Sequence, residues 1–186
     1  MNNTPNKVAE FNKVSFEQFW TSLHFSNDNL KEFVKSMFDG FNLPKRSTTN
    51  SAGYDFYSPI YFTLKPGETL KIPTGIKAIM QPNVFFAIFP RSSVGMKYKC
   101  TLDNTVGIID ADFSSEKSIG HIMLQFTNHH KRSIFPWVNK KHTWIVNPND
   151  RICQGIFIPY GITNDDSVNT ERTGGMGSTG QWGGHN

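Results

Sequence analysis

Two carboxylates, Asp110 and Asp112, stand two residues apart at the end of the apolar stretch 104–113. If this stretch is an extended strand, the two side chains lie on the same face. A carboxylate in that position can act as a general base for an attacking water. Asn104, at the start of the stretch, carries an amide that can read the edge of a nucleobase. The alternative is a hairpin in which the aspartates cap a turn, and the residue types leave both interpretations open.

A second group of polar residues follows an apolar strand and a proline. Arg91, Ser92, Ser93 and Gly95 offer a guanidinium, two hydroxyls and backbone amides that no bulky side chain covers. These groups suit phosphate oxygens, although the same residues would also make an ordinary turn.

Three further segments carry weaker signals. Asp55 follows the permissive Gly53, and Arg151 and Gln154 are expected on one face of a strand. Near the C-terminus, Arg172 precedes a glycine-rich run over 174–180 that has almost nothing to bury. We expect a flexible arm that closes over phosphates, while composition alone favours a plain disordered end.

The elements that would position these groups are short strands separated by Gly, Pro and Asn. The pattern predicts strands at Thr69–Pro73, Val84–Phe89, His121–Phe126, Thr143–Val146 and Arg151–Pro159. Turn residues recur at intervals typical of a sandwich or barrel. We therefore expect an all-β fold, a jelly-roll-like distorted β-barrel, over residues 43–162.

Two amphipathic helices are predicted before this β domain. In the first, Ser15 and Gln18 form a capping box ahead of an aromatic face. The second has Asn29 and Glu32 as its cap and Gly40 as its stop. Residues 1–12 are polar and expected to be disordered or loosely attached. The predicted organisation is a helical extension over 1–42, the β domain over 43–162 and the arm over 163–186.

Charge and cysteine content limit the possible partners. The formal net charge is +4, with Lys and Arg scattered apart from two small clusters at 129–132 and 140–141. This charge permits an anionic ligand, but direct binding of nucleic acid is not expected. No run is long enough to cross a bilayer, so we expect a soluble protein that acts in the cytoplasm. Cys100 and Cys153 are interpreted as buried thiols.

Taken in order, the five polar segments resemble the five motifs of the trimeric deoxyuridine triphosphatases (dUTPases). The first is similar to Ala52-Gly53-Tyr54-Asp55 and the second to 90–95. The third resembles Gly107-Ile108-Ile109-Asp110-Ala111-Asp112-Phe113, the fourth Arg151-Ile152-Cys153-Gln154, and the fifth 172–180. The resemblance covers about residues 43–180. Because five motifs match in the right succession, coincidence is a poor explanation.

This resemblance implies Mg²⁺-dependent hydrolysis of dUTP to dUMP and pyrophosphate in a homotrimer with shared active sites. Asp110 would be the general base, and Asp55 would reach the metal through water. Phe113 would pack under the deoxyribose, and Arg172 would close over the distal phosphates. The implied substrate-binding residues are Arg91, Ser92, Ser93, Gly95, Asn104, Gly107, Phe113, Gln154, Arg172, Met176, Gly177, Ser178 and Thr179.

The chain departs from the family pattern at several places. Phe113 stands where the family has Tyr, and Met176 stands where a Phe stacks on uracil. Segments 114–118 and 131–141 are insertions, and they or the N-terminal helices could bind a protein partner. The competing functions are a dCTP deaminase-like enzyme and a regulatory binding module switched by a nucleotide. If the chain is phage-encoded, its place of action would be the host cytoplasm.

Overall fold

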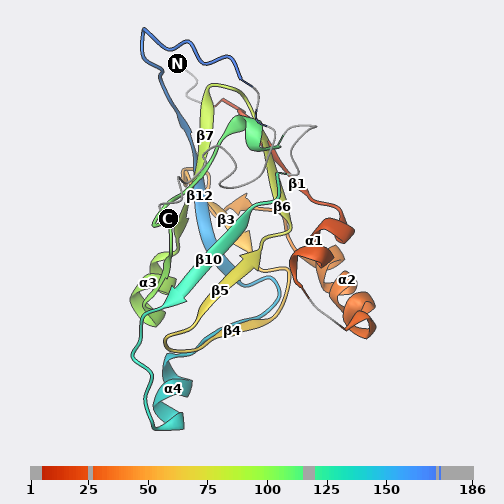
Figure 1. Cartoon of the computed structure of the whole chain (residues 1–186), viewed down its shortest axis with the longest axis vertical. Coiled ribbons are helices and arrows are strands. Elements are labelled where there is room, and N and C mark those ends of the chain that lie inside the picture. The colour runs from red at the N-terminus through yellow and green to blue at the C-terminus, as the bar shows by residue number, and fades with distance from the viewer. Residues whose placement is uncertain (1–5, 25–26, 115–119, 171, 173–186) are drawn as a thin grey trace, which may run out of the picture.

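The computed structural model describes residues 6–24, 27–114, 120–170 and 172, and this part of the chain is richer in strand than in helix (Figure 1). Its strands are β1 (Ala9–Lys13), β2 (Lys45–Arg46), β3 (Tyr54–Tyr57), β4 (Phe62–Leu64), β5 (Thr69–Pro73), β6 (Ile76–Met80), β7 (Val84–Pro90), β8 (Cys100–Leu102), β9 (Gly107–Ile109), β10 (Met123–Asn128), β11 (Trp144–Val146) and β12 (Arg151–Pro159). Its helices are α1 (Phe16–Ser22), α2 (Lys31–Gly40), α3 (Ser92–Tyr98) and α4 (Pro136–His142), with short 3₁₀ turns η1 (Asp28–Leu30) and η2 (Ala111–Ser114).

The strands form antiparallel sheets. The largest has the order β2-β3-β12-β7-β9, and a second has the order β5-β10-β8. Two strand pairs, β11-β4 and β1-β6, complete the arrangement. The predicted all-β, jelly-roll-like class is confirmed, although within the described residues the sheets do not close into one continuous barrel.

The predicted strands are all present, with small shifts at their ends. β5 and β12 have the predicted bounds, and β7 extends one residue further, to Pro90. β10 begins two residues later than predicted, at Met123, but the expected alternation holds because Ile122, Leu124 and Phe126 are buried. In β10, period-2 burial therefore shows which face meets the core, whereas β5, β7 and β12 bury consecutive residues.

The prediction that residues 1–12 are loosely attached is wrong for its second half. Ala9–Lys13 forms β1, which pairs antiparallel with β6. Phe11 explains the attachment, since its ring contacts the rings of Tyr54, Phe56, Phe86 and Phe157 with centroids 5.3–5.6 Å away. One aromatic anchor in a polar stretch is enough to add a strand.

Both predicted N-terminal helices exist. Ser15 and Gln18 form the predicted capping box of α1. The predicted cap of the second helix is wrong: the Asn27 side chain caps η1, and α2 follows without a side-chain cap. Because η1 occupies Asp28–Leu30, Asn29 lies inside the 3₁₀ turn, where it cannot start the helix.

The two helices cover one side of the β domain beside β1 and β6 (Figure 1). Phe19, Val34, Phe38 and Phe41 are buried and join the main hydrophobic core. Gly75, with φ +71°, allows this close packing because a Cβ there would lie 3.0 Å from the Phe38 ring and 3.1 Å from the Phe41 ring. In the described part of the chain, no helix has the length and apolar content required to span a membrane.

Candidate active site

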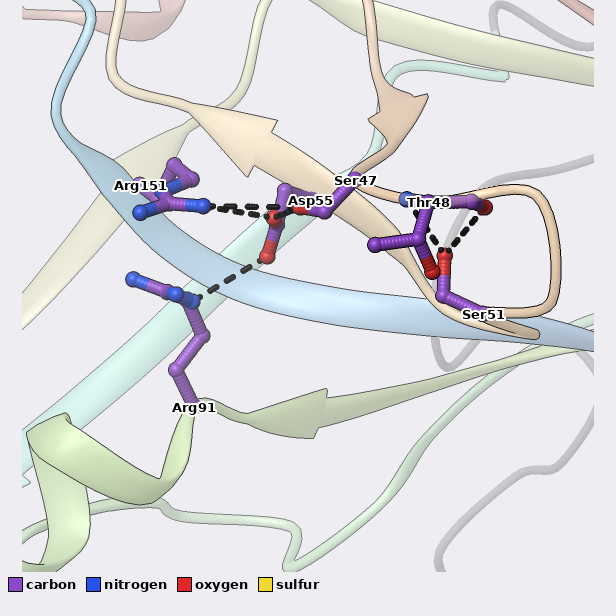
Figure 2. Close-up of polar contacts among 6 residues, drawn as sticks. All are labelled: Ser47, Thr48, Ser51, Asp55, Arg91 and Arg151. Carbon is purple, nitrogen blue, oxygen red and sulfur yellow. Dashed lines mark hydrogen bonds and ion pairs between the residues drawn. The ribbon is translucent and has the colours of Figure 1, made fainter.

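Asp55 on β3 is buried and is the centre of a polar cluster that reaches the surface (Figure 2). Its Oδ1 atom lies 3.1 Å from Arg91 Nε, and its Oδ2 atom lies 3.2 Å from Arg151 Nη1. The Ser47 hydroxyl donates a hydrogen bond of 2.8 Å to Oδ2. One carboxylate thus holds two guanidinium groups, and the cluster keeps a net positive charge that suits phosphate oxygens.

The strand pairing explains why these side chains converge. Gln154 on β12 lies opposite Asp55 on β3, so the two share a face. Arg151, three residues before Gln154, would point to the other face of a regular strand, but the register shifts between Arg151 and Cys153. This bulge returns Arg151 to the Asp55 face, as predicted from the sequence. Gly53 leaves room for Gln154, because a Cβ there would lie 3.1 Å from Gln154 Oε1.

The second motif begins at the end of β7 and forms the first turn of α3. Arg91 is the N-terminal cap residue, and Ser92 and Ser93 are exposed in the first turn of the helix. Both hydroxyls therefore remain accessible next to the Asp55 cluster. The residue types predicted either a phosphate-binding segment or an ordinary turn here, and the helix is an additional finding.

A cavity of about 250 Å³ lies beside the connection between β8 and β9, two strands that belong to different sheets. Asn104, Gly107 and Ile108 line it together with residues of β5, β7 and β10. Gly107 is buried against Ile88, where a Cβ would lie 3.4 Å from the Ile88 Cβ. Because Gly107 has no side chain, the β9 backbone can lie close to both the neighbouring strand and the cavity.

The Asp103 side chain holds the connection between β8 and β9 in place. Its carboxylate accepts hydrogen bonds of 2.6 Å from both Gln125 and Thr127 on β10. The turn passes through Thr105 at φ +58°. Asn104 at the tip is therefore held by its neighbours in a defined position.

The predicted base lies directly after β9. Asp110 is exposed, and its Oδ2 atom lies 3.1 Å from Arg172 Nη1. Arg172 Nη1 also lies 3.4 Å from Asp112 Oδ1. The Arg172 Cζ atom lies 5.3 Å from the centroid of the Phe113 ring. Arg172 thus joins both carboxylates, and Phe113 is buried below it with 4% of its surface exposed.

The structure does not bring these two groups together within one chain. Ile109 pairs with Phe86 on β7, so Asp110 lies beside Phe85, whereas Arg91 follows the opposite end of β7. The six residues from Phe85 to Arg91 correspond to about 20 Å of extended strand. Asp110 and Arg172 form one half of the predicted site, and the Asp55 cluster forms the other.

The remaining predicted site residues are placed as follows. Met176, Gly177, Ser178 and Thr179 lie outside the described residues. Ser47, Asp103 and Arg151 contribute contacts that the predicted residue set did not contain. Arg151 could be recognised from its position in the fourth motif. Ser47 could not, because it reaches Asp55 only through the fold of the β2–β3 hairpin.

The two cysteines take no part in this chemistry. Both are buried, and burial raises the pKa of the Cys100 thiol to about 12 and that of the Cys153 thiol further. Both therefore stay protonated, which agrees with the prediction of buried thiols.

Comparison with known proteins identifies the family. The dUTPase family model matches residues 39–180. The chain is 37% identical to the deoxyuridine 5'-triphosphate nucleotidohydrolase of Lactococcus lactis, over 76% of this chain and 89% of the relative. It is 33% identical to the enzyme of that name from Paraburkholderia xenovorans, over 75% and 89%.

Solved structures agree. The dUTPase of Streptococcus mutans superposes with a TM-score of 0.58 at 28% identity, covering 83% of this chain and 98% of that one. The dUTPase of Staphylococcus bacteriophage 80alpha, solved with dUPNHPP, gives a TM-score of 0.60 at 16% identity, over 89% and 90%. A mutant dUTPase of phage phi11 of S. aureus, with a structural Mg(II) ion, gives 0.61 at 17% identity, over 88% and 98%. The chain belongs to the dUTPase family.

Proposed function

We propose that this protein hydrolyses dUTP to dUMP and pyrophosphate, with Asp110 as the general base. The observation that carries the proposal is the connection between β8 and β9, which lines a cavity with Asn104 and Gly107 and leads directly into Asp110. A base held in that cavity has its sugar and α-phosphate directed along β9 toward the carboxylate.

The β8–β9 connection supplies the groups that distinguish uracil. The Asn104 amide can donate and accept, and the buried Gly107 backbone brings peptide groups to the same cavity. Uracil presents O4 and N3–H to such groups, whereas cytosine presents the opposite pattern. Each mismatched buried polar group costs about 1–3 kcal/mol, so two mismatches correspond to roughly 10²–10⁴ in specificity.

Asp110 is suited to take a proton from water. Its carboxylate is exposed and held by Arg172 at 3.1 Å. When the triphosphate arrives, its oxygens compete for the Arg172 guanidinium, and Asp110 is released to accept the proton. The water oxygen then bonds to the α-phosphorus, the bond from that phosphorus to the bridging oxygen breaks, and pyrophosphate leaves with the electron pair.

The Asp55 cluster is suited to the phosphate chain. Arg91, Ser92 and Gln154 would contact phosphate oxygens, with Ser93 and Gly95 at the first turn of α3 beside them. Arg151 and Ser47 hold Asp55 in place, at 3.2 and 2.8 Å.

The donor set also fits Mg²⁺ that arrives with the nucleotide. Within the described residues no group of three or more metal-ligating side chains gathers, which agrees with an ion that keeps its waters and binds through few carboxylates. Asp55 Oδ1 forms an ion pair with Arg91 Nε and has lone pairs that can accept from a metal-bound water. When bound, Mg²⁺ would neutralise phosphate charge and orient the chain for in-line attack.

The distance between the two half-sites supports active sites shared between chains, as in the homotrimer that the family resemblance implies. Since Asp110 and Arg91 lie about 20 Å apart along β7, one chain would supply the β8–β9 connection and Asp110 while a neighbour supplies the Asp55 cluster. Arg172 already contacts Asp110 of its own chain, so two chains are sufficient to unite the described contacts.

The place of action would be the cytoplasm, or the host cytoplasm for a phage-encoded chain. Both cysteines, Cys100 and Cys153, are free thiols in this structure. Such cysteine usage is typical of a reducing compartment.

Purified protein incubated with Mg²⁺ and dUTP, dCTP or UTP tests the proposal. We expect dUMP and pyrophosphate from dUTP, with dCTP and UTP turned over at least 10²-fold more slowly. Asp110→Asn keeps the side-chain shape but cannot take the proton, so kcat should fall by about 10²–10⁴ while binding of a non-hydrolysable dUTP analogue is retained. Release of ammonia from dCTP would instead indicate a deaminase.

A further inference from the structure

The inserted segment 131–141 presents large apolar side chains to solvent. Ile134 is 89% exposed and Trp137 is 68% exposed, with Phe135 and Ile145 also exposed. The N-terminal helices differ, because they bury Phe19 and Phe38 in the core and leave only scattered apolar side chains outside. Among the described residues of the surfaces expected to bind a protein partner, segment 131–141 therefore carries the most exposed apolar side chains, and residues 115–118 of the other insertion lie outside the described residues.

This segment also accounts for the net charge of the protein. Residues 129–149 contain Lys131, Arg132, Lys140 and Lys141 and no Asp or Glu. The chain as a whole carries +4, so the remaining sequence has equal numbers of basic and acidic residues. These cations form two clusters in the sequence. One cluster precedes α4 and the other lies in the last turn of α4, and this helix is at one end of the molecule (Figure 1).

A groove of about 710 Å³ lies between α4 and β11. Ile134, Pro136 and Ile145 provide its apolar lining. The cationic side chains that line it are Lys65, Arg132 and Lys140. Glu68, 3.9 Å from Lys65, is the one carboxylate that the described contacts place near these cations.

The groove is held in shape by hydrogen bonds within the segment. The Asn139 side chain accepts from Ser133 N and donates to Ser133 O, both at 2.7 Å. At the base, the buried Asn128 side chain donates to His142 O at 2.9 Å and accepts from His130 N at 3.1 Å. A surface ordered before binding loses little conformational entropy when a partner docks.

The combination favours a peptide over the other polyanions. Single-stranded nucleic acid needs aromatic faces on which bases stack. Phe135 and Trp137 are stacked on each other, with centroids 4.9 Å apart, and neither lines the groove. A flat anionic membrane would contact the rim but could not enter the concave apolar part.

We propose that this groove binds an acidic amphipathic segment of a partner protein. Apolar side chains of that segment pack against Ile134, Pro136 and Ile145, and its carboxylates pair with Lys65, Arg132 and Lys140. This inference deepens the expectation of a protein partner and does not depend on dUTP hydrolysis, which serves as a control.

Fluorescence anisotropy with a labelled peptide carrying Leu and Glu at helical spacing tests the inference. We expect saturable binding that weakens with salt, and no binding of peptides with Gln for Glu or Ser for Leu. Arg132→Glu should weaken binding about tenfold or more. Lys7→Glu, an equal charge change at an exposed lysine outside the groove, should leave it unchanged. Ile134→Ser should weaken binding, and Ile162→Ser, at a residue 73% exposed elsewhere, should not.

Three results would overturn the inference. The first is absent peptide binding, or equal binding by wild type and Arg132→Glu, in protein whose melting temperature and dUTP turnover are unchanged. The second is tighter binding of labelled oligothymidylate, or of phosphatidylcholine–phosphatidylserine vesicles, than of the peptide. The third is dissociation of the oligomer by Ile134→Ser in sedimentation, since a second copy of the chain would then occupy the groove.

Discussion

Mixing two inactive variants measures whether the active site is shared between chains. Arg91→Gln removes a guanidinium from the Asp55 cluster while leaving Asp55 a hydrogen-bond donor, and Asp110→Asn removes the base. Each parent should lose at least 10²-fold in kcat. In an equal, random mixture every chain carries one defect, so a site within one chain is never intact. A site that takes Arg91 from one chain and Asp110 from a neighbour is intact in about a quarter of cases.

The assay is co-expression of the two variants with different affinity tags, purification through both, and measurement of pyrophosphate release per site. Purification through both tags leaves only hybrid trimers, in which roughly one site in three combines an intact Arg91 with an intact Asp110. We therefore expect roughly a third of wild-type kcat, with KM for dUTP unchanged because the recovered sites are chemically complete. Mixing the separately purified, non-exchanged parents is the control and should stay inactive. Hybrid oligomers, demonstrated by native mass spectrometry, with no more activity than the parents would refute the separation inferred from the β7–β9 register.

Other consequences of the structure can be tested with single variants. In Gly155→Ala, the new Cβ would lie 2.1 Å from the fully buried Phe86 ring. We expect about 1–3 kcal/mol of destabilisation, seen as a lower Tm and relieved by adding Phe86→Leu. An unchanged Tm would contradict this packing. Burial lowers the pKa of His121 from 6.5 to about 4. The folded state therefore favours neutral His121, its stabilisation is complete above pH 6.5, and about 2–3 kcal/mol is lost as the pH falls toward 4. Denaturant titrations at pH 5 and 7 should show this loss, and His121→Asn, which still offers Gly75 N an acceptor, should remove most of it. Phe113→Leu should raise kcat/KM for UTP relative to dUTP, while Phe113→Tyr should not, because an aromatic ring at this position leaves no room for a 2′-hydroxyl. If the ratio of kcat/KM for UTP to that for dUTP were the same in both variants, the sugar would be selected by other residues.

The sequence was informative where one pattern decides one structural choice. The apolar patterns predicted β5, β7, β10, β11 and β12 to within two residues, and in β10 the buried residues alternate as expected. The Ser15–Gln18 capping box likewise fixed the start of α1.

Other features depend on long-range contacts that no local pattern contains. β1 is held by Phe11 against rings from three distant strands, so its polar neighbours gave a misleading signal. The cap of the second helix was assigned wrongly because Asn27 and Asn29 both fit a capping pattern, and the η1 turn selects the first.

The candidate site was predictable by residue type but not by geometry. The motifs named Asp55, Arg91 and Asp110, whereas Ser47 enters only because the β2–β3 hairpin folds its hydroxyl onto Asp55. The separation of Asp110 from Arg91 follows from strand register, which a list of motifs does not contain.

Hydrolysis of dUTP in heavy-oxygen water tests the central claim most directly. If Asp110 activates a water that attacks the α-phosphorus, mass spectrometry should find one heavy oxygen in dUMP and none in pyrophosphate. Heavy oxygen in pyrophosphate would show attack at the β-phosphorus, and a dUMP product formed without any label would exclude the proposed water attack.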